Sequence, residues 1–245
     1  PQDEGNNIIT ILEVALKGGT VASPDGLNGW GGLMRLLSKT GVDYSRRKFL
    51  EVWVNDFGAR RGKMHVDLGT LPEDAMWQPD AAPNGRLDTE DKNHDQRLDA
   101  TGSRGTDDED SGLDGVFDET EQTALNPPPV PSGCEQILAN DRAGDSYCYN
   151  SDRSGSDYSH INGTEDNGRL DTEDLDGNAS LNSEEAYFHY AIDLAADTVA
   201  AFGKPGTGWR LYRIPLRDGL VAAGAPTLDR DVKSVRFWFS DIDQP

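Results

Sequence analysis

The stretch GKMHVDLG, residues 62–69, sets three apolar side chains in alternation with three polar ones. The apolar members are Met64, Val66 and Leu68, and the polar members are Lys63, His65 and Asp67. A period of two is typical of a β-strand that is buried on one face only. Just before it, FLEVWVNDF at 49–57 is rich in β-branched and aromatic residues and predicts a second strand.

The same alternation returns near the C-terminus in three further segments. Its apolar members are Phe188, Tyr190, Ile192 and Leu194, then Tyr212, Ile214 and Leu216, and finally Val235, Phe237 and Phe239. Near the N-terminus, IITILEVAL at 8–16 predicts one more strand. We also expect a short helix that begins at Asn28 and ends at Gly41, because four apolar residues follow the spacing of one helical face. They are Trp30, Leu33, Met34 and Leu37.

These patterns predict an all-β fold, namely an antiparallel β-sandwich of jelly-roll type with about six to eight strands and one short helix. Helices do not alternate with the strands, which disfavours a parallel α/β fold. Residues 1–72 and 186–245 are expected to form the sandwich core, and 73–185 a long insertion in one connection. A structureless loop of that length is implausible in a compact domain unless something orders it.

The 245-residue chain carries a formal net charge of −21, and the whole excess lies in the insertion. Residues 73–185 hold 29 acidic and 7 basic side chains, whereas the rest of the chain has 15 acidic and 16 basic ones. Nucleic acid is therefore a poor partner, because phosphate contacts need Lys and Arg. No apolar run is long enough to form a membrane-spanning helix. A local excess of carboxylates indicates bound cations, with an acidic disordered loop as the alternative.

An element of sequence NGRLDTED occurs twice in the insertion, at 84–91 and at 167–174. Each copy continues into a calcium-loop pattern, in which oxygen ligands occupy positions 1, 3, 5, 7, 9 and 12. The ligands predicted in the loop 174–185 are Asp174, Asp176, Asn178, the Ser180 carbonyl, Asn182 and Glu185. Those predicted in the loop 91–102 are Asp91, Asn93, Asp95, the Arg97 carbonyl and Asp99. Its twelfth position is Gly102, so the last ligand is missing or comes from elsewhere.

Both loops lack the usual glycine at position 6, which predicts a strained or differently shaped turn at Gln96 and Ala179. The repeated element also fits half of a further loop, whose ligands would be Asn84 and Asp88 in the first copy and Asn167 and Asp171 in the second. A third candidate loop, DSGLDGVFDETE at 110–121, offers Asp110, Asp114, the Val116 carbonyl, Asp118 and Glu121.

All of these ligands are oxygen atoms, so we expect several Ca²⁺ ions, ahead of Mg²⁺ or Mn²⁺. Their role would be structural, because apposed carboxylates repel one another until cations neutralise them. The only two cysteines, Cys134 and Cys148, are expected to form a disulfide in an exported protein, with two unrelated thiols as the alternative. The chain begins at Pro1, and we expect a processed chain or a domain cut from a larger protein.

Catalysis finds little support in the sequence. The four histidines are scattered, and no hydrolase, metalloprotease or phosphate-binding motif is present. A glycosidase-like pair of carboxylates is the remaining option, but nearly all the carboxylates of the insertion are explained as metal ligands. We therefore expect a protein that is not an enzyme.

Five segments, in this order, resemble the extracytoplasmic repeat domain of the SprA family. They are FLEVWVND, GKMHVDLGTLPEDA, SGLDGVFDETE, WRLYRIPL and VKSVRFWFSD. Members of this family are large gliding-motility proteins of Bacteroidetes-type bacteria and act as the outer-membrane translocon of the type IX secretion system. The resemblance implies an all-β domain, a place at the cell surface, outer membrane or periplasm, and a role in protein export. The NGRLDTED segments are not part of the pattern of the family, and no catalytic residue carries over.

We therefore expect a calcium-stabilised structural or interaction domain of a SprA-like translocon. Its partners would be other domains or subunits of a secretion or surface assembly. The rival hypothesis is a carbohydrate-binding module with structural calcium, in which exposed tryptophans bind a glycan. A concave face with two or three exposed aromatic side chains in a row would favour the rival. The candidates are Trp53, Trp77, Trp209 and Trp238.

Overall fold

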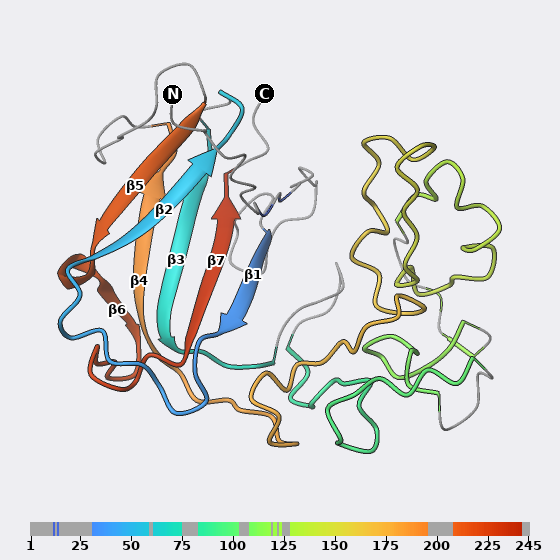
Figure 1. Cartoon of the computed structure of the whole chain (residues 1–245), viewed down its shortest axis with the longest axis horizontal. Coiled ribbons are helices and arrows are strands. Elements are labelled where there is room, and N and C mark those ends of the chain that lie inside the picture. Colours follow the sequence, from blue (N-terminus) through green and yellow to red (C-terminus); the bar gives the residue numbers. More distant parts are fainter. Residues whose placement is uncertain are drawn as a thin grey trace, which may run out of the picture.

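The structure of the chain is a computed structural model. It describes residues 12, 14, 31–58, 61–74, 83–102, 108–118, 120–121, 123, 128–195 and 208–241. The elements are β1 (Gly31–Leu36), β2 (Phe49–Asn55), β3 (Lys63–Thr70), β4 (Ala186–Asp193), β5 (Trp209–Pro215), the short 3₁₀ helix η1 (Leu216–Asp218), β6 (Leu220–Ala223) and β7 (Ser234–Ser240). The predicted all-β class is confirmed (Figure 1).

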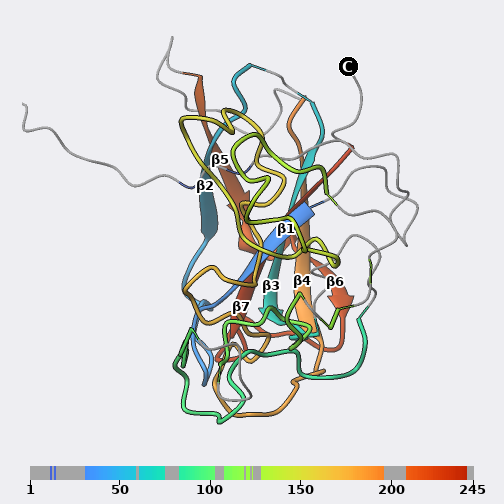
Figure 2. The same ribbon diagram turned by 90° about the vertical axis from the view of Figure 1, so that its right-hand side faces the viewer.

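The strands form two antiparallel sheets. The larger has five strands in the order β1-β7-β3-β4-β6, and the smaller pairs β2 with β5. The smaller sheet lies across the larger one in both ribbon views (Figures 1 and 2), which gives a sandwich. The jelly-roll connectivity that we expected is a finer statement and stays a prediction. The strand expected at 8–16 falls outside the described residues, except for 12 and 14, which lie in no strand.

The alternation in 62–69 defines the inner face of the sandwich, as predicted. Met64, Val66 and Leu68 are at most 2% exposed and meet Tyr212 and Ile214 of the opposite sheet in one apolar cluster. Burying side chains of this size contributes roughly 1.5–3 kcal/mol each to folding. All members of the cluster come from outside 73–185, so the core of the sandwich is independent of the insertion.

The helix expected between Asn28 and Gly41 is wrong where the structure describes this segment. Residues 31–36 form β1, which pairs with β7 from Gly31 opposite Phe239 to Leu36 opposite Ser234. The apolar spacing over so few residues fits either a helix or a strand, and the adjacent glycines disfavour the helix. Gly32 also fits the close approach, because a β-carbon there would lie 2.7 Å from the Phe237 carbonyl oxygen. Pairing along a whole strand edge therefore overrides the local helical pattern.

The outer face of β3 carries a buried polar network instead of solvated side chains. Asp67, which is 1% exposed, accepts hydrogen bonds from His189 Nδ1 (2.6 Å), Arg236 Nε (2.8 Å) and Trp238 Nε1 (3.0 Å). His65 lies 3.3 Å from His189 through its Nδ1 and 2.9 Å from the Ser240 hydroxyl through its Nε2. The Trp238 ring stacks on His65 with 3.6 Å between ring centroids.

The insertion leaves the larger sheet at the end of β3 and returns at the start of β4. These two ends are neighbours, because Thr70 pairs with Ala186. The described residues between 83 and 185 contain no strand or helix, only isolated bridges, and they lie beside the sandwich on the side of β1 (Figure 1). Loops without regular structure need some other source of order.

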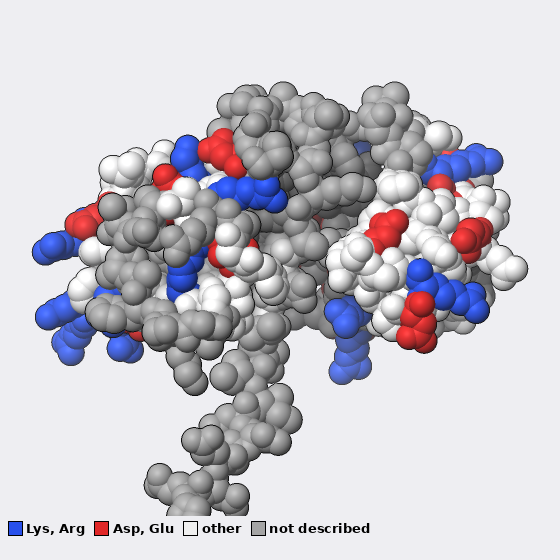
Figure 3. All heavy atoms as spheres, turned by 90° about the horizontal axis from the view of Figure 1, so that it is seen from above, with Lys and Arg blue, Asp and Glu red and all other residues white. Residues whose placement is uncertain are grey.

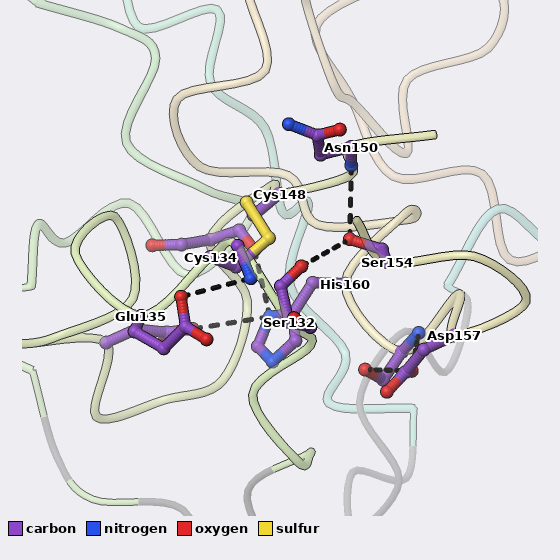
Figure 4. Close-up of a disulfide and its surroundings, with 12 residues drawn as sticks. Ser132, Cys134, Glu135, Cys148, Asn150, Ser154, Asp157 and His160 are labelled. Atoms are coloured by element: carbon purple, nitrogen blue, oxygen red, sulfur yellow. Dashed lines mark hydrogen bonds and ion pairs between the residues drawn. A yellow bond between two sulfur atoms is a disulfide. The ribbon is translucent and has the colours of Figure 1, made fainter. Parts of the chain in front are cut away.

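One such source is the disulfide between Cys134 and Cys148, which confirms the predicted pair (Figure 4). Together with Leu138, the two cysteines form a small buried cluster of their own. A disulfide of this kind indicates an oxidising, extracytoplasmic environment. Within the described ranges, no helix has the length and apolar character that crossing a membrane would require.

Candidate metal centre

The insertion buries an unusual amount of negative charge. Eleven of its carboxylate residues belong to the buried set: Glu73, Glu90, Asp91, Asp108, Glu109, Asp110, Asp118, Glu121, Asp145, Glu165 and Glu173. The same set of described residues contains no Lys or Arg. On the coloured parts of the face shown in Figure 3, acidic side chains stand among basic ones. A buried carboxylate is costly unless it is paired or coordinates a metal ion, so a group of buried carboxylates of this size is a candidate place for bound cations.

The two predicted calcium loops close in the same way. In the loop 91–102, the Asp91 carboxylate accepts hydrogen bonds from the backbone N–H groups of Asp95 (2.9 Å) and Gln96 (2.8 Å). In the loop 174–185, Asp174 accepts the equivalent bonds from Asn178 (2.9 Å) and Ala179 (2.7 Å). Positions 1 and 5 of each pattern are thus brought together on the inside of a tight turn.

Positions 3 and 9 also meet across each loop. Asn93 Nδ2 donates to Asp99 Oδ2, and Asn182 Nδ2 donates to Asp176 Oδ2, each over 3.0 Å. Hydrogen bonds therefore connect position 1 with position 5, and position 3 with position 9, in both loops. The carbonyl positions Arg97 and Ser180 follow directly, where their N–H groups bond Asp95 (2.9 Å) and Asn178 (2.8 Å).

Position 6 is left-handed in both loops, with φ of 63° at Gln96 and 59° at Ala179. This conformation costs a residue with a β-carbon roughly 1–2 kcal/mol, so the strained turn expected from the missing glycine is present. The two loops also touch, because Gln96 Nε2 donates to the Gly177 carbonyl over 3.3 Å. Strain of this kind persists only where the surrounding interactions over-determine the turn.

The carboxylate facing each loop comes from outside the twelve residues of the loop. Glu109 accepts N–H groups from Lys92 (2.9 Å) and Asp99 (3.0 Å) of the first loop. Glu73 accepts those of Leu175 and Asn182 of the second loop, each at 3.1 Å. Sequence spacing predicted Glu185 for the second loop and left the first open, but Glu185 is exposed and no described contact joins it to the loop.

Glu73 also completes a set of possible metal ligands with Asp174 and Asp176, whose ligand atoms all lie within 4.8 Å of one another. Glu73 and Asp176 line a cavity of about 280 Å³ at the end of the larger sheet. Leu71 and Lys233 line the same cavity. Neither Glu73 nor Glu109 has a signal in the sequence, because nothing in the spacing relates them to the loops that they face.

The two half-loops are completed by distant aspartates. Asp74 accepts the N–H groups of Asn84 (2.9 Å) and Gly85 (2.7 Å), as Asp91 and Asp174 do in the complete loops. In the second copy, Asp110 accepts those of Asn167 (3.1 Å) and Gly168 (3.0 Å). The predicted ligand pairs are in contact: Asn84 donates to Asp88 over 2.6 Å, and Asn167 donates to Asp171.

The Asp110 carboxylate therefore contacts the second repeat, whereas the sequence assigned it to the first position of the loop 110–121. The physical reason is the bridge between Ser111 and Glu165, which places residue 110 beside the start of the second repeat. Within 110–121, Asp114 accepts the N–H of Val116 over 2.9 Å, as position 5 of the pattern should. Asp110, the first position of that loop, is thus hydrogen-bonded to the second NGRLDTED copy instead of to the described residues of its own loop.

The two NGRLDTED copies pair with each other about a local twofold axis. Thr89 forms an antiparallel bridge with Thr172, which is the equivalent residue of the other copy. Glu90 accepts the N–H of Asp171 over 2.9 Å, and Glu173 accepts that of Asp88 over 3.1 Å. These reciprocal bonds explain why the glutamate recurs in both copies, a signal that the sequence contained and that our ligand assignment did not use.

Three carboxylates of the candidate loop 110–121, Asp114, Asp118 and Glu121, form a further group with Asp145 and Glu165. Burial raises the pKa of Asp145 and Glu165 to about 8 and that of Glu121 to about 7, and neighbouring carboxylates add to each shift. Asp145 and Glu165 were not identified from the sequence. They fit no loop pattern, because the group forms only when three separate segments fold together.

Without divalent cations, the insertion should be more stable at about pH 5.5 than at about pH 8.5. Burial raises the pKa of Glu90 and Glu165 to about 8, above the 4.5 of an ordinary glutamate. The folded chain then binds protons more tightly than the unfolded chain, so the free energy of unfolding rises as the pH falls from about 8 towards 4.5. Limited proteolysis in chelator, normalised to an unfolded peptide, measures this. Faster cleavage of 83–185 at the lower pH would contradict it.

A scan of protein-family models finds no match to this chain, and a search of curated proteins finds none either. Its function must therefore be argued from the residues themselves.

Proposed function

We propose that residues 73–185 form a calcium-binding module whose folding is coupled to ion binding, on a β-sandwich that is a structural or interaction domain and not an enzyme. The observation that carries this proposal is the burial of eleven carboxylates, with no Lys or Arg in the buried set of the described residues. In the folded chain these groups lose the water that screened them. Bound cations restore the charge balance, so their binding free energy becomes folding free energy.

The donor set supports calcium over other divalent ions. The candidate positions supply carboxylate, amide and backbone carbonyl oxygens, and the ligand groups among described residues include no His or Cys. Such hard oxygen ligands suit Ca²⁺, Mg²⁺ or Mn²⁺. Loops with several carboxylates and a carbonyl favour Ca²⁺, which accepts six to eight oxygens in a flexible geometry, whereas Mg²⁺ requires near-ideal octahedral sites.

Replacing Asp174 by Asn should weaken calcium binding by at least about tenfold at one site. The substitution keeps one oxygen, which can still accept the N–H of Asn178, but it replaces the second oxygen, which accepts the N–H of Ala179, by an amide nitrogen, and it removes the charge at the first position of the loop. Isothermal titration calorimetry of the full chain with CaCl₂ measures the effect. The matched control is Asp152→Asn, because Asp152 is an exposed carboxylate of the same insertion. Equal isotherms for the two variants would argue against the loop.

The wider role in a SprA-like translocon, at a cell surface or outer membrane, is a proposal that the strand motifs quoted above support. An all-β domain with a disulfide suits the extracytoplasmic part of a secretion assembly. The disulfide between Cys134 and Cys148 agrees with an exported protein. Co-purification of the native parent protein with its membrane fraction, followed by peptide sequencing beyond residues 1 and 245, tests this role directly.

Two exposed aromatic side chains favour the rival role of a carbohydrate-binding module. Phe49 and Trp53 are 47% and 54% exposed and lie on the outer face of β2, with Glu51 between them. Trp238 does not join them, because it packs on His65 in the other sheet. Quenching of tryptophan fluorescence by soluble oligosaccharides, and its loss in Trp53→Ala, would establish glycan binding. Unchanged fluorescence would leave the structural role as the proposal.

A further inference from the structure

Three segments of the insertion meet at Glu165. Its backbone bridges Ser111 on one side and Ser146 on the other. Its carboxylate accepts hydrogen bonds from the Ser146 hydroxyl (3.2 Å) and from the N–H of Asp118 (3.4 Å). The region around Asp118, the region around Asp145 and the start of the second repeat are therefore held side by side.

Two buried side chains at this junction have oxygens without a hydrogen-bond donor. Asp145 is 4% exposed, and neither of its carboxylate oxygens has a hydrogen-bond partner among the described residues. Glu121 is 5% exposed; its Oε2 accepts the N–H of Ala143 over 3.1 Å, but its Oε1 has no such partner there. Buried polar atoms in native proteins are nearly always satisfied, so these oxygens point to a ligand.

The carboxylates around Glu121 form two groups of metal-ligand spacing. One consists of Asp114, Glu121 and Asp145, and the other of Asp118, Glu121 and Glu165. Within each group the ligand oxygens lie within 4.8 Å of one another. Calcium–oxygen distances of about 2.3–2.6 Å allow oxygens on opposite sides of one ion to be that far apart. Glu121 is the only member of both groups.

We propose that Glu121 bridges a pair of Ca²⁺ ions, one held with Asp114 and Asp145 and the other with Asp118 and Glu165. Five carboxylates carry five negative charges when ionised, and two divalent cations neutralise four of them, whereas a single ion would leave three negative charges in a buried place. The inference rests on the proposed calcium binding. It extends that proposal to a centre outside the loops 91–102 and 174–185.

This paired centre would tie the disulfide-containing segment to the second NGRLDTED copy. Asp145 lies three residues before Cys148, and Thr164 N–H donates to the Asp145 carbonyl over 2.7 Å, next to Glu165. The ions would therefore lock the junction of segments that the sequence separates by up to about fifty residues, where hydrogen bonds alone leave carboxylate oxygens unsatisfied.

The test counts calcium ions per chain by equilibrium dialysis and elemental analysis. We expect Glu121→Gln to bind two ions fewer than the unmodified chain, while Glu135→Gln, an exposed glutamate of the same insertion, binds the full number. An unmodified chain that binds no calcium would refute the proposed function itself. An unmodified chain that binds calcium, with a Glu121→Gln variant that binds the same number, would refute only the paired centre. A loss of one ion would refute the bridging by Glu121.

A second measurement does not depend on the folding of any variant. Crystals of the unmodified chain grown with calcium should show two anomalous-difference peaks that both contact the Glu121 carboxylate. Water alone, or a single peak, at this position would overturn the pair, even if peaks appear in the loops at Asp91 and Asp174.

Discussion

Chelation of divalent cations should unfold the insertion and leave the sandwich folded. A site that is saturated a hundredfold above its dissociation constant contributes about 2.7 kcal/mol, so each occupied site that is lost lowers the amide protection of the region by roughly a hundredfold. We expect the amides of 83–185 to lose at least that much protection in EDTA, because two or more sites are emptied together. Hydrogen exchange with mass spectrometry measures it peptide by peptide.

The internal control is the pair of strands β3 and β4. Their apolar core, with Val66 and Tyr190 among its members, contains no residue of the insertion and should keep its protection in EDTA. Protection of 83–185 should return when calcium is added in excess. Equal exchange of the insertion with and without chelator would mean that its order does not depend on cations, and would remove the basis of the proposed function.

Replacing Asp67 by Ala should destabilise the sandwich by about 3–5 kcal/mol. Burial alone would raise the pKa of Asp67, but the hydrogen bond from His189 and the charge of Arg236 hold it below its usual value, so the carboxylate is charged in the folded chain. Its removal leaves three partly buried donors, on His189, Arg236 and Trp238, without their shared acceptor.

Denaturant unfolding in excess calcium, followed by tryptophan fluorescence, measures the loss. The stacked pair of Trp238 and His65 makes the emission sensitive to this part of the sheet. Asp229→Ala is the matched control, because the Asp229 side chain is 63% exposed and its contact with Arg230 is a surface ion pair. A change below about 1 kcal/mol in Asp67→Ala would show that the network contributes little to stability.

The sequence predicted the parts of this molecule that depend on near neighbours. Alternation over 62–69 identified β3 and its inner face, because successive side chains of a strand point to opposite faces of the sheet. The same reasoning failed for 28–41, where pairing with the distant β7 determines the structure of β1. Short apolar patterns carry no information about which edge will pair with them.

In the loops, too, local features could be predicted from the sequence and contacts with residues outside the loop could not. The positions Asp91 and Asp174 were predicted from local spacing, and the structure uses each of them to close its turn. The acids that face the loops, Glu73 and Glu109, lie up to 109 residues away from their hydrogen-bond partners. The half-loops likewise take Asp110 from 57 residues upstream. The packing of the whole insertion brings such partners together. They therefore cannot be predicted from the repeat or from the spacing within one loop.

The neighbouring positions of Thr70 and Ala186 have a consequence for engineering. A segment whose two ends lie on adjacent antiparallel strands can take the place of the turn in an antiparallel hairpin. Residues 73–185 are therefore a candidate graft, to be transplanted between the strands of an unrelated β-protein. There they would act as a lobe that calcium makes rigid and a chelator loosens.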